Sequence, residues 1–360
     1  MAFFQRLADP YHDMWESVIR PPREKYDVKQ LGPQSFTMGD WVYRRTDLTL
    51  TVSALQLRCS HFEPVDSERI AEKLPCVIYL HGNRSCRLEA LPAVSLLLPQ
   101  NITLFCYDSR SCGLSEGEYI SLGWFERQDL RVVVEHLRSS GSVSWVGLWG
   151  RSMGAVTALM YSELDPSIGG MVLDSPFTSL PVLIEEVAKS QALIPRLLVS
   201  PGIGLLRKIV SYKADFDIKD VDPLRSIANC KVPALFAAGN YDVLVRPHHA
   251  VTLHDQFPGE KQLIFINGDH NSPRPDSFHD SVASFFSLKL HCNVLPRYKM
   301  VQAPLPKDSD DTMELEELPK QESVEQWAEE LQDLALQESL ERTHSQNFFA
   351  YRQLFSTVPR

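Results

Sequence analysis

The chain has 360 residues, of which 44% are hydrophobic, and its formal net charge is −10 at pH 7. This length and apolar content are enough for a substantial core, and they favour one large α/β domain with an appended tail. Residues 301–360 contain 13 acidic and 5 basic side chains, so the rest of the chain is close to neutral. A near-neutral body gives no electrostatic reason to expect a nucleic-acid partner.

The sequence indicates neither a membrane span nor an exported protein. No run of 18 apolar residues occurs, and the first residues lack the apolar core of a signal peptide. We therefore expect a cytoplasmic protein without a transmembrane segment, and peripheral contact with a membrane is compatible with this composition. Seven cysteines without paired metal-site spacing indicate free thiols in a reducing compartment. We expect no metal ion and no cofactor.

The chain divides into four parts by composition. We expect an N-terminal segment (1–35) that packs on the body, an α/β domain (36–294) with an insertion at about 178–227, an acidic linker (295–320) and a helical tail (321–360). Aromatic residues before a Pro-Pro pair predict a short helix within residues 9–23. Prolines and the acidic residues 308–311 are typical of a disordered linker.

The predicted strands favour a mostly parallel central sheet flanked by helices. Residues 36–61 alternate in polarity and are rich in β-branched side chains, which is typical of antiparallel edge strands. The later apolar runs are short and continuous, as expected of strands that are buried on both faces of a parallel sheet. These runs are residues 75–80, 102–107, 143–149, 170–173, 233–238 and 262–266. Residues 124–137 show the pattern of a covering helix.

Residues 143–158 predict a strand, a tight turn and a helix in immediate succession. The turn contains Gly150-Arg151-Ser152-Met153-Gly154. A serine at such a turn is held in a strained conformation with its hydroxyl above the sheet, and the glycines remove the Cβ atoms that would block the reversal. Ser152 is therefore a candidate nucleophile. The alternative is a small-residue turn in an ordinary α/β unit, because this short motif also occurs by chance.

The turn His81-Gly82-Asn83 follows the first buried strand. In an open parallel sheet the ligand crevice lies at the carboxyl ends of the strands, so this turn is expected beside Ser152. The backbone amides of Met153 and Asn83 are the candidate donors to a developing oxyanion. His81 is expected to be structural. The alternative is a plain connection between a strand and a loop.

A carboxylate and a histidine follow Ser152 along the chain. Asp242 lies in a turn directly after a predicted strand, and we favour it over Asp174 as the group that orients a histidine. His270 follows both the serine and the acid and can accept the Ser152 proton. The remaining histidines of this region lie in predicted helices, where solvated or capping roles are expected. They are His248, His249, His254 and His279.

Six motifs occur in a characteristic order over roughly residues 50–290. They are His81-Gly82-Asn83, Tyr107-Asp108-Ser109-Arg110 with Gly113-Leu114-Ser115, Gly150-Arg151-Ser152-Met153-Gly154, Asp174-Ser175-Pro176-Phe177, Gly239 with Asp242, and Gly268 with His270. Together they resemble the α/β-hydrolase superfamily, in particular its serine aminopeptidase-like and acyl-protein-thioesterase-like members. The resemblance implies the α/β-hydrolase fold with a helical lid insertion. Because these subfamilies share the motifs, the substrate does not follow.

The predicted function is that of a serine hydrolase that forms an acyl-enzyme on Ser152 and cleaves an ester, thioester or amide. Its substrate would be a small or acylated molecule. The insertion at 178–227 is either an apolar lid suited to an acyl chain or an extra pair of covering helices, and the sequence does not separate these alternatives. The competing function is a noncatalytic scaffold that binds protein partners through its tail.

The tail contains a predicted helix that resembles a ubiquitin-interacting motif. Ala335 and Ser339 lie four residues apart and share one face, with acidic residues before them. A small alanine allows this helix to lie close to an apolar patch on the partner protein. The sequence departs from the motif at Gln332 and Arg342. The alternative is an acidic helix that packs on the body or stays solvated.

Overall fold

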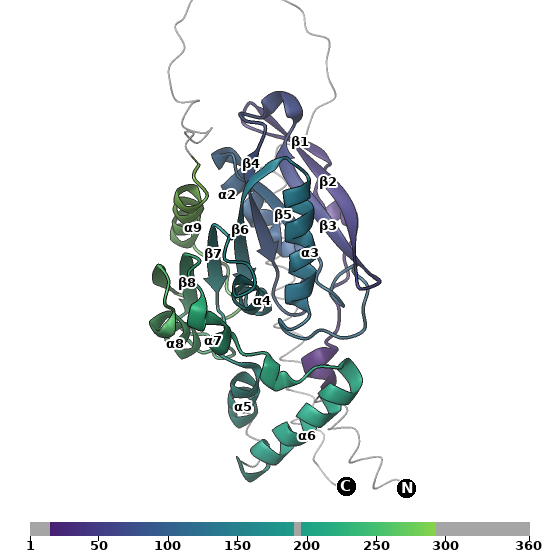
Figure 1. The fold of residues 1–360 in the computed structure, drawn as a ribbon, viewed down its shortest axis with the longest axis vertical. Coiled ribbons are helices and arrows are strands. Elements are labelled where there is room, and N and C mark those ends of the chain that lie inside the picture. The colour runs from purple at the N-terminus through teal and green to yellow at the C-terminus, as the bar shows by residue number, and fades with distance from the viewer. Residues whose placement is uncertain (1–14, 191–195, 293–360) are drawn as a thin grey trace, which may run out of the picture.

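A mixed sheet forms the centre of the molecule (Figure 1). The computed structural model describes residues 15–190 and 196–292 of the chain, and within these residues the sheet has nine strands. The strands are β1 (Ser35–Met38), β2 (Trp41–Val52), β3 (Leu55–Pro64), β4 (Leu74–Leu80), β5 (Thr103–Tyr107), β6 (Val143–Arg151), β7 (Gly170–Asp174), β8 (Ala234–Gly239) and β9 (Lys261–Ile266). In space they follow the order β1-β2-β3-β5-β4-β6-β7-β8-β9.

The first three strands pair antiparallel, and those from β4 onward run parallel to one another. The β2–β3 hairpin pairs Tyr43 with Pro64 at one end and Val52 with Leu55 at the other. β3 pairs antiparallel with β5, and the pairs from β5–β4 to β8–β9 are all parallel. Every residue of β5 and β7 is buried, as continuous apolar strands covered on both faces require. The predicted strands and the mostly parallel sheet are confirmed.

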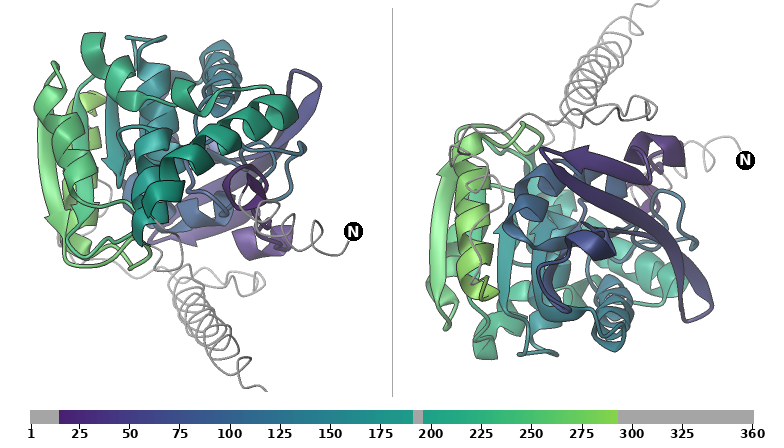
Figure 2. Two further views of the ribbon diagram at one scale, coloured as in Figure 1. Left: turned by 90° about the horizontal axis from the view of Figure 1, so that it is seen from below. Right: turned by 90° about the horizontal axis from the view of Figure 1, so that it is seen from above.

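Helices cover both faces of the sheet (Figure 2). The helices are α2 (Leu91–Leu97), α3 (Glu126–Ser139), α4 (Met153–Ser162), α5 (Leu180–Ser190), α6 (Arg196–Ala214), α7 (Pro223–Ser226), α8 (His248–Gln256) and α9 (Asp276–Lys289). Short 3₁₀ turns lie at Val28–Leu31, Asp66–Glu68, Arg87–Ala90, Leu98–Gln100, Ile218–Asp220 and Ile227–Asn229. One core cluster joins the sheet to α3, α4 and α8, and a second joins its other face to α2 and α9.

The N-terminal segment and the insertion share a third apolar cluster with the start of α4. Residues 15–19 are helical, and Trp15 and Ile19 are buried in this cluster. Leu206 and Val210 enter it from the inner face of α6, and Met153 enters it from α4. The insertion is therefore helical, as predicted, and its inner face is part of the packed interior. A lid movement stays a prediction.

Other predictions depend on residues beyond those described. The linker at 295–320 and the tail with Ala335 and Ser339 lie outside the described residues, so the ubiquitin prediction is untested. Within the described residues, no helix combines the length and apolar character that a membrane crossing requires. All seven cysteines are free thiols, and six of them are buried.

The packing of α6 can be tested with two adjacent leucines. We expect Leu206→Ala to lower the free energy of unfolding by about 2–4 kcal/mol, because Leu206 is 1% exposed and its truncation leaves a cavity. Leu205→Ala is the matched control, since Leu205 is 42% exposed, and it should change stability by less than about 0.5 kcal/mol. Urea unfolding measures both. Equal losses of stability in the two variants would contradict the conclusion that Leu206, and not Leu205, lies on the inner face of α6.

Candidate active site

The predicted site residues follow different strands and meet at one end of the sheet. Ser152 follows β6, Asp242 follows β8 and His270 lies beyond β9, while Asn83 comes after β4 and Met153 begins α4. Because these strands are parallel, their carboxyl ends open on the same side. The helices α5 and α6 lie at that end of the molecule (Figure 1).

Ser152 occupies a strained turn between β6 and α4. Its backbone angles are φ 50° and ψ −113°, which a residue with a side chain rarely adopts. A Cβ at Gly150 would overlap the backbone of Gly154, and a Cβ at Gly154 would overlap the carbonyl of Leu80 at the end of β4. Glycine at both positions therefore lets α4 start immediately against the sheet. This close approach raises the Ser152 side chain above the strand ends.

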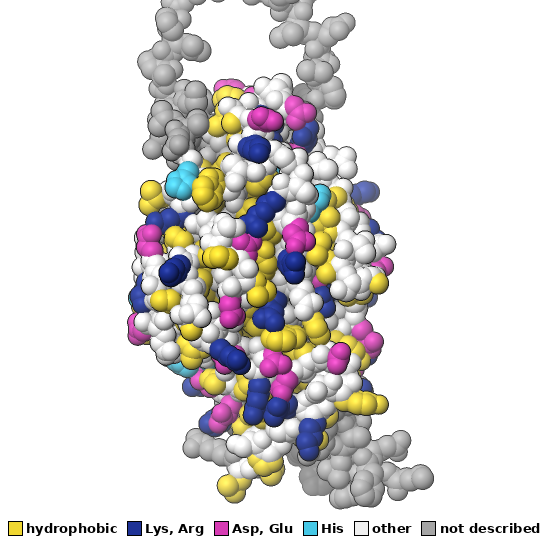
Figure 3. All heavy atoms as spheres, in the orientation of Figure 1, with side chains coloured by type: hydrophobic (Ala, Val, Ile, Leu, Met, Phe, Trp, Pro, Cys, Tyr) yellow, Lys and Arg dark blue, Asp and Glu magenta, His cyan; other side chains and the backbone are white. Residues whose placement is uncertain are grey.

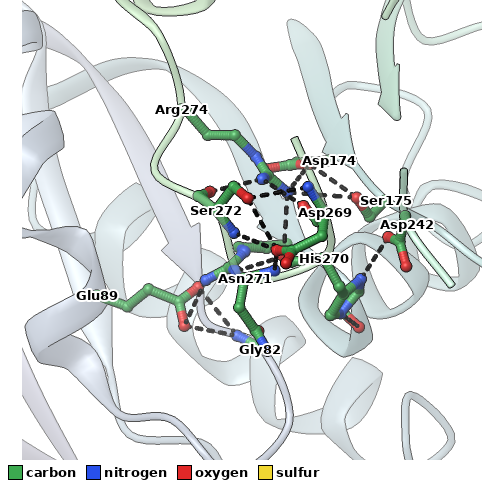
Figure 4. Close-up of polar contacts among 12 residues, drawn as sticks. Gly82, Glu89, Asp174, Ser175, Asp242, Asp269, His270, Asn271, Ser272 and Arg274 are labelled. Atoms are coloured by element: carbon green, nitrogen blue, oxygen red, sulfur yellow. Dashed lines mark hydrogen bonds and ion pairs between the residues drawn. The ribbon is translucent and has the colours of Figure 1, made fainter. Parts of the chain in front are cut away.

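Ser152, His270 and Asp242 form one chain of hydrogen bonds. The Ser152 Oγ lies 3.1 Å from Nε2 of His270, and Nδ1 of His270 lies 2.6 Å from Oδ2 of Asp242. Figure 4 shows the Asp242 contact to the imidazole ring. The other carboxylate oxygen of Asp242 accepts the backbone N–H groups of Leu244 and Val245 at 3.0 and 2.8 Å. Asp242 is 3% exposed, so its orientation is fixed on both sides.

The competing carboxylate, Asp174, has a different partner. Arg274 donates two hydrogen bonds to it, from Nε to Oδ2 at 2.7 Å and from Nη2 to Oδ1 at 2.9 Å (Figure 4). Arg274 also donates to the carbonyl of Ser272 at 2.8 Å and to that of His270 at 3.4 Å. The structure therefore brings Asp242, and not Asp174, to the His270 ring. The Asp174–Arg274 pair joins the end of β7 to the loop that carries His270.

Arg151 and Glu89 connect the His270 loop with the turn after β4. Arg151 donates from Nη2 to the His270 carbonyl at 2.7 Å, and its Nη1 lies 3.6 Å from Oε2 of Glu89. Glu89 accepts the Gly82 N–H at 3.2 and 3.3 Å with its two oxygens (Figure 4). The sequence reasoning missed Glu89 and Arg274 and gave Arg151 no role. Of these three residues, only Arg151 could have been singled out from the sequence, since it lies inside the Gly-x-Ser-x-Gly motif.

The turn after β4 is held by His81. This residue is 1% exposed, and its two ring nitrogens contact the carbonyl of Gly82 at 2.7 Å and the N–H of Ser109 at 2.9 Å. Because the Ser109 N–H donates to Nε2, the ring proton lies on Nδ1 and is donated to Gly82. His81 thus fixes the conformation of the turn that contains Asn83, as expected of a structural histidine.

One histidine contradicts the expectation of a solvated role. His249 is fully buried at the start of α8, whereas His248 beside it is exposed. The reason is the helical period, because His249 shares the inner face of α8 with Leu253 four residues later.

Among the described residues, the side chains of Glu186, His248 and His249 bring three potential metal-ligand atoms within 4.8 Å of one another.

Comparisons with known proteins agree with this architecture. Residues 72–229 match the family described as Serine aminopeptidase, S33. The uncharacterized protein YqkD of Bacillus subtilis (strain 168) is 28% identical over 198 residues, which span 54% of this chain and 64% of the Bacillus protein. The uncharacterized protein YfhR of Salmonella typhi is 27% identical over 224 residues, which span 58% of this chain and 68% of YfhR.

Solved structures of esterases share the fold. The esterase Pf2001 of Pyrococcus furiosus superimposes with a TM-score of 0.57 and 21% identity, over 75% of this chain and 98% of the esterase. Acetyl xylan esterase 1 of Thermoanaerobacterium sp. JW/SL YS485 gives a TM-score of 0.55 and 17% identity, over 79% of this chain and 93% of that enzyme. At these identities the likeness concerns the arrangement of strands and helices.

The role of Arg274 can be tested by unfolding. We expect Arg274→Ala to lower the free energy of unfolding by about 3–5 kcal/mol, because it leaves the buried carboxylate of Asp174 without its cation. Arg138→Ala removes a more exposed pair with Asp165 and should cost about 1 kcal/mol or less. Urea denaturation of the two variants makes the comparison. A loss no larger than that of Arg138→Ala would show that the Asp174 pair does not hold the loop.

Proposed function

We propose that the chain is an α/β-hydrolase of the serine hydrolase type that cleaves an ester, thioester or amide, and the match of residues 72–229 to the serine aminopeptidase S33 family and the fold shared with solved esterases support this. The observation that carries the proposal is the continuous contact from Ser152 through His270 to Asp242, at 3.1 and 2.6 Å. A nucleophile, a base and an orienting carboxylate within hydrogen-bond reach are the arrangement that acyl transfer requires.

The proposed mechanism depends on the positions of the protons on His270 and Ser152. Asp242 accepts the Nδ1–H of His270, which leaves Nε2 free to accept the Ser152 proton as Oγ attacks the carbonyl carbon of the substrate. His270 then donates that proton to the leaving group, and an acyl-enzyme on Ser152 remains. Water, deprotonated by His270, attacks the acyl carbon and releases the acid and free Ser152.

We assign the oxyanion donors to the backbone N–H groups of Met153 and Asn83. Met153 is the first residue of α4, so its N–H has no acceptor within the helix, and the helix N-terminus favours negative charge. The Ser152 N–H donates instead to the Asp174 carbonyl at 2.7 Å, and the Gly82 N–H donates to Glu89. Asn83 is therefore the next amide along the turn that can face the serine.

The surroundings favour an apolar acyl group in the substrate. Tyr241, Val243 and Leu244 are exposed around the buried Asp242, and α6 exposes further apolar side chains. Figure 3 shows hydrophobic side chains at the end of the molecule where α6 lies. An exposed apolar surface of this kind can contact an acyl chain. Together with the esterase neighbours, this makes carboxylic esters the first class of substrate to assay, ahead of thioesters and amides.

The nucleophile is tested with Ser152→Ala. We expect this variant to lose labelling by a fluorophosphonate probe and to lose at least about 10³-fold in turnover on acyl esters, because no other group can form the acyl-enzyme. A panel of acyl esters, acyl thioesters and aminoacyl amides identifies the substrate class. Ser95→Ala, at an exposed serine of α2, should keep both labelling and turnover. Undiminished turnover of Ser152→Ala would reject the proposal.

The acid is tested by exchanging each carboxylate for its amide. Asp242→Asn keeps the shape of the side chain but cannot hold the required His270 tautomer, so we expect kcat to fall by roughly 10³–10⁴. Asp174→Asn should act on stability through Arg274 and lower kcat much less. Steady-state kinetics and thermal unfolding of both variants separate the two effects. The reverse ranking of kcat would assign the orienting role to Asp174.

A further inference from the structure

A second cluster of polar side chains connects the insertion to α8. Glu186 lies on α5, and His248 and His249 are the first two residues of α8. Both carboxylate oxygens of Glu186 lie close to Nε2 of His248, at 3.0 and 3.1 Å, and Oε2 lies 3.4 Å from Nε2 of His249. The two imidazole rings face each other with centroids 4.3 Å apart. The cluster is separate from the contacts of Ser152.

His249 has an unsatisfied nitrogen that is aimed into this cluster. Its side chain is fully buried, and Nε2 makes no hydrogen bond within the part of the chain that is described. Buried polar atoms almost always have a partner, since burial without one costs free energy. The neighbouring acceptor is Oε2 of Glu186, at 3.4 Å, which is long for a hydrogen bond. An unpartnered imidazole nitrogen beside a carboxylate and a second imidazole is suited to a metal ion.

We propose that Glu186, His248 and His249 bind one zinc ion. Two imidazoles and one carboxylate are a ligand set that zinc accepts, with a fourth position left for water. Tetrahedral coordination at about 2.0–2.1 Å places ligand atoms roughly 3.4 Å apart. Oε2 of Glu186 lies 3.1 Å from Nε2 of His248 and 3.4 Å from Nε2 of His249, which is close to that spacing. His248 and Glu186 are partly exposed, which leaves a path for the ion to enter.

Thr178 completes the surroundings of His249. Its hydroxyl lies 3.0 Å from Nδ1 of His249, and its backbone N–H lies 3.3 Å from the same atom. Zinc at Nε2 would leave the ring proton on Nδ1, where the Thr178 hydroxyl can accept it, and the Thr178 N–H would then give up its hydrogen bond to Nδ1.

The zinc site would act as a clamp on the insertion. Glu186 lies in α5, whereas the two histidines begin the helix that follows the Asp242 loop. A bound ion would therefore fix α5 against the element beside the orienting acid, without contact to the Ser152 chemistry. Among the described residues, the group of side chains that could hold a metal contains no cysteine.

The site is tested by titrating the chelator-treated, full-length protein with Zn²⁺. We expect one zinc ion per chain by isothermal titration calorimetry, and a rise in the melting temperature on zinc addition. Glu186→Gln and His248→Asn should each weaken binding by about tenfold or more and remove the thermal shift. Both residues are partly exposed, so these changes leave the buried core intact.

His254→Asn is the matched control, because His254 lies on the same helix beside Asp255 at 3.3 Å but outside the cluster. It should keep the zinc affinity and the thermal shift of the unmodified chain. Zinc binding that persists unchanged in Glu186→Gln and His248→Asn would place the metal elsewhere and overturn the proposal. Absence of zinc binding by the unmodified protein would overturn it as well.

Discussion

The close contact between α4 and the end of β4 is the constraint on which the site depends. Gly150 and Gly154 allow backbone to approach backbone with no side chain between them, and Ser152 has its strained conformation in the turn that joins β6 to this closely packed helix. Strain of this kind persists only where the surrounding structure fixes it. The Ser152 N–H is accordingly held by the Asp174 carbonyl of the neighbouring strand.

The second requirement is that loops from distant parts of the chain meet this serine. Arg151 and Arg274 both donate to the backbone carbonyl of His270, and Arg274 reaches that point from its pair with Asp174. Because these contacts hold the main chain, the imidazole keeps its own hydrogen-bonding atoms for Asp242 and Ser152. Glu89 extends the same set of contacts to the turn that carries Asn83.

Much of this arrangement could be predicted from the sequence because its signals are local. Continuous apolar runs indicate buried parallel strands, and the placement of Ser152, Asp242 and His270 after strand ends brings them to one edge. Arg274 and Glu89 could not be found in this way, since Arg274 pairs with a residue 100 positions earlier and no periodic pattern marks either residue. The burial of His249 was predicted wrongly, because α8 is short and its inner face depends on what packs against it. The cytoplasmic location and the ubiquitin motif stay predictions.

β9 lies at the edge of the sheet, where a strand can separate from its single neighbour while the rest of the domain stays folded. Among the described strands β9 pairs with β8 alone, and most of its residues are incompletely buried. Edge elements open locally at a lower free energy than the whole domain unfolds. Release of β9 would displace the loop that carries His270 and Arg274, whereas Ser152 lies between β6 and α4 in the middle of the sheet. Local opening at this edge of the sheet would therefore separate the imidazole from the serine before the helices unfold.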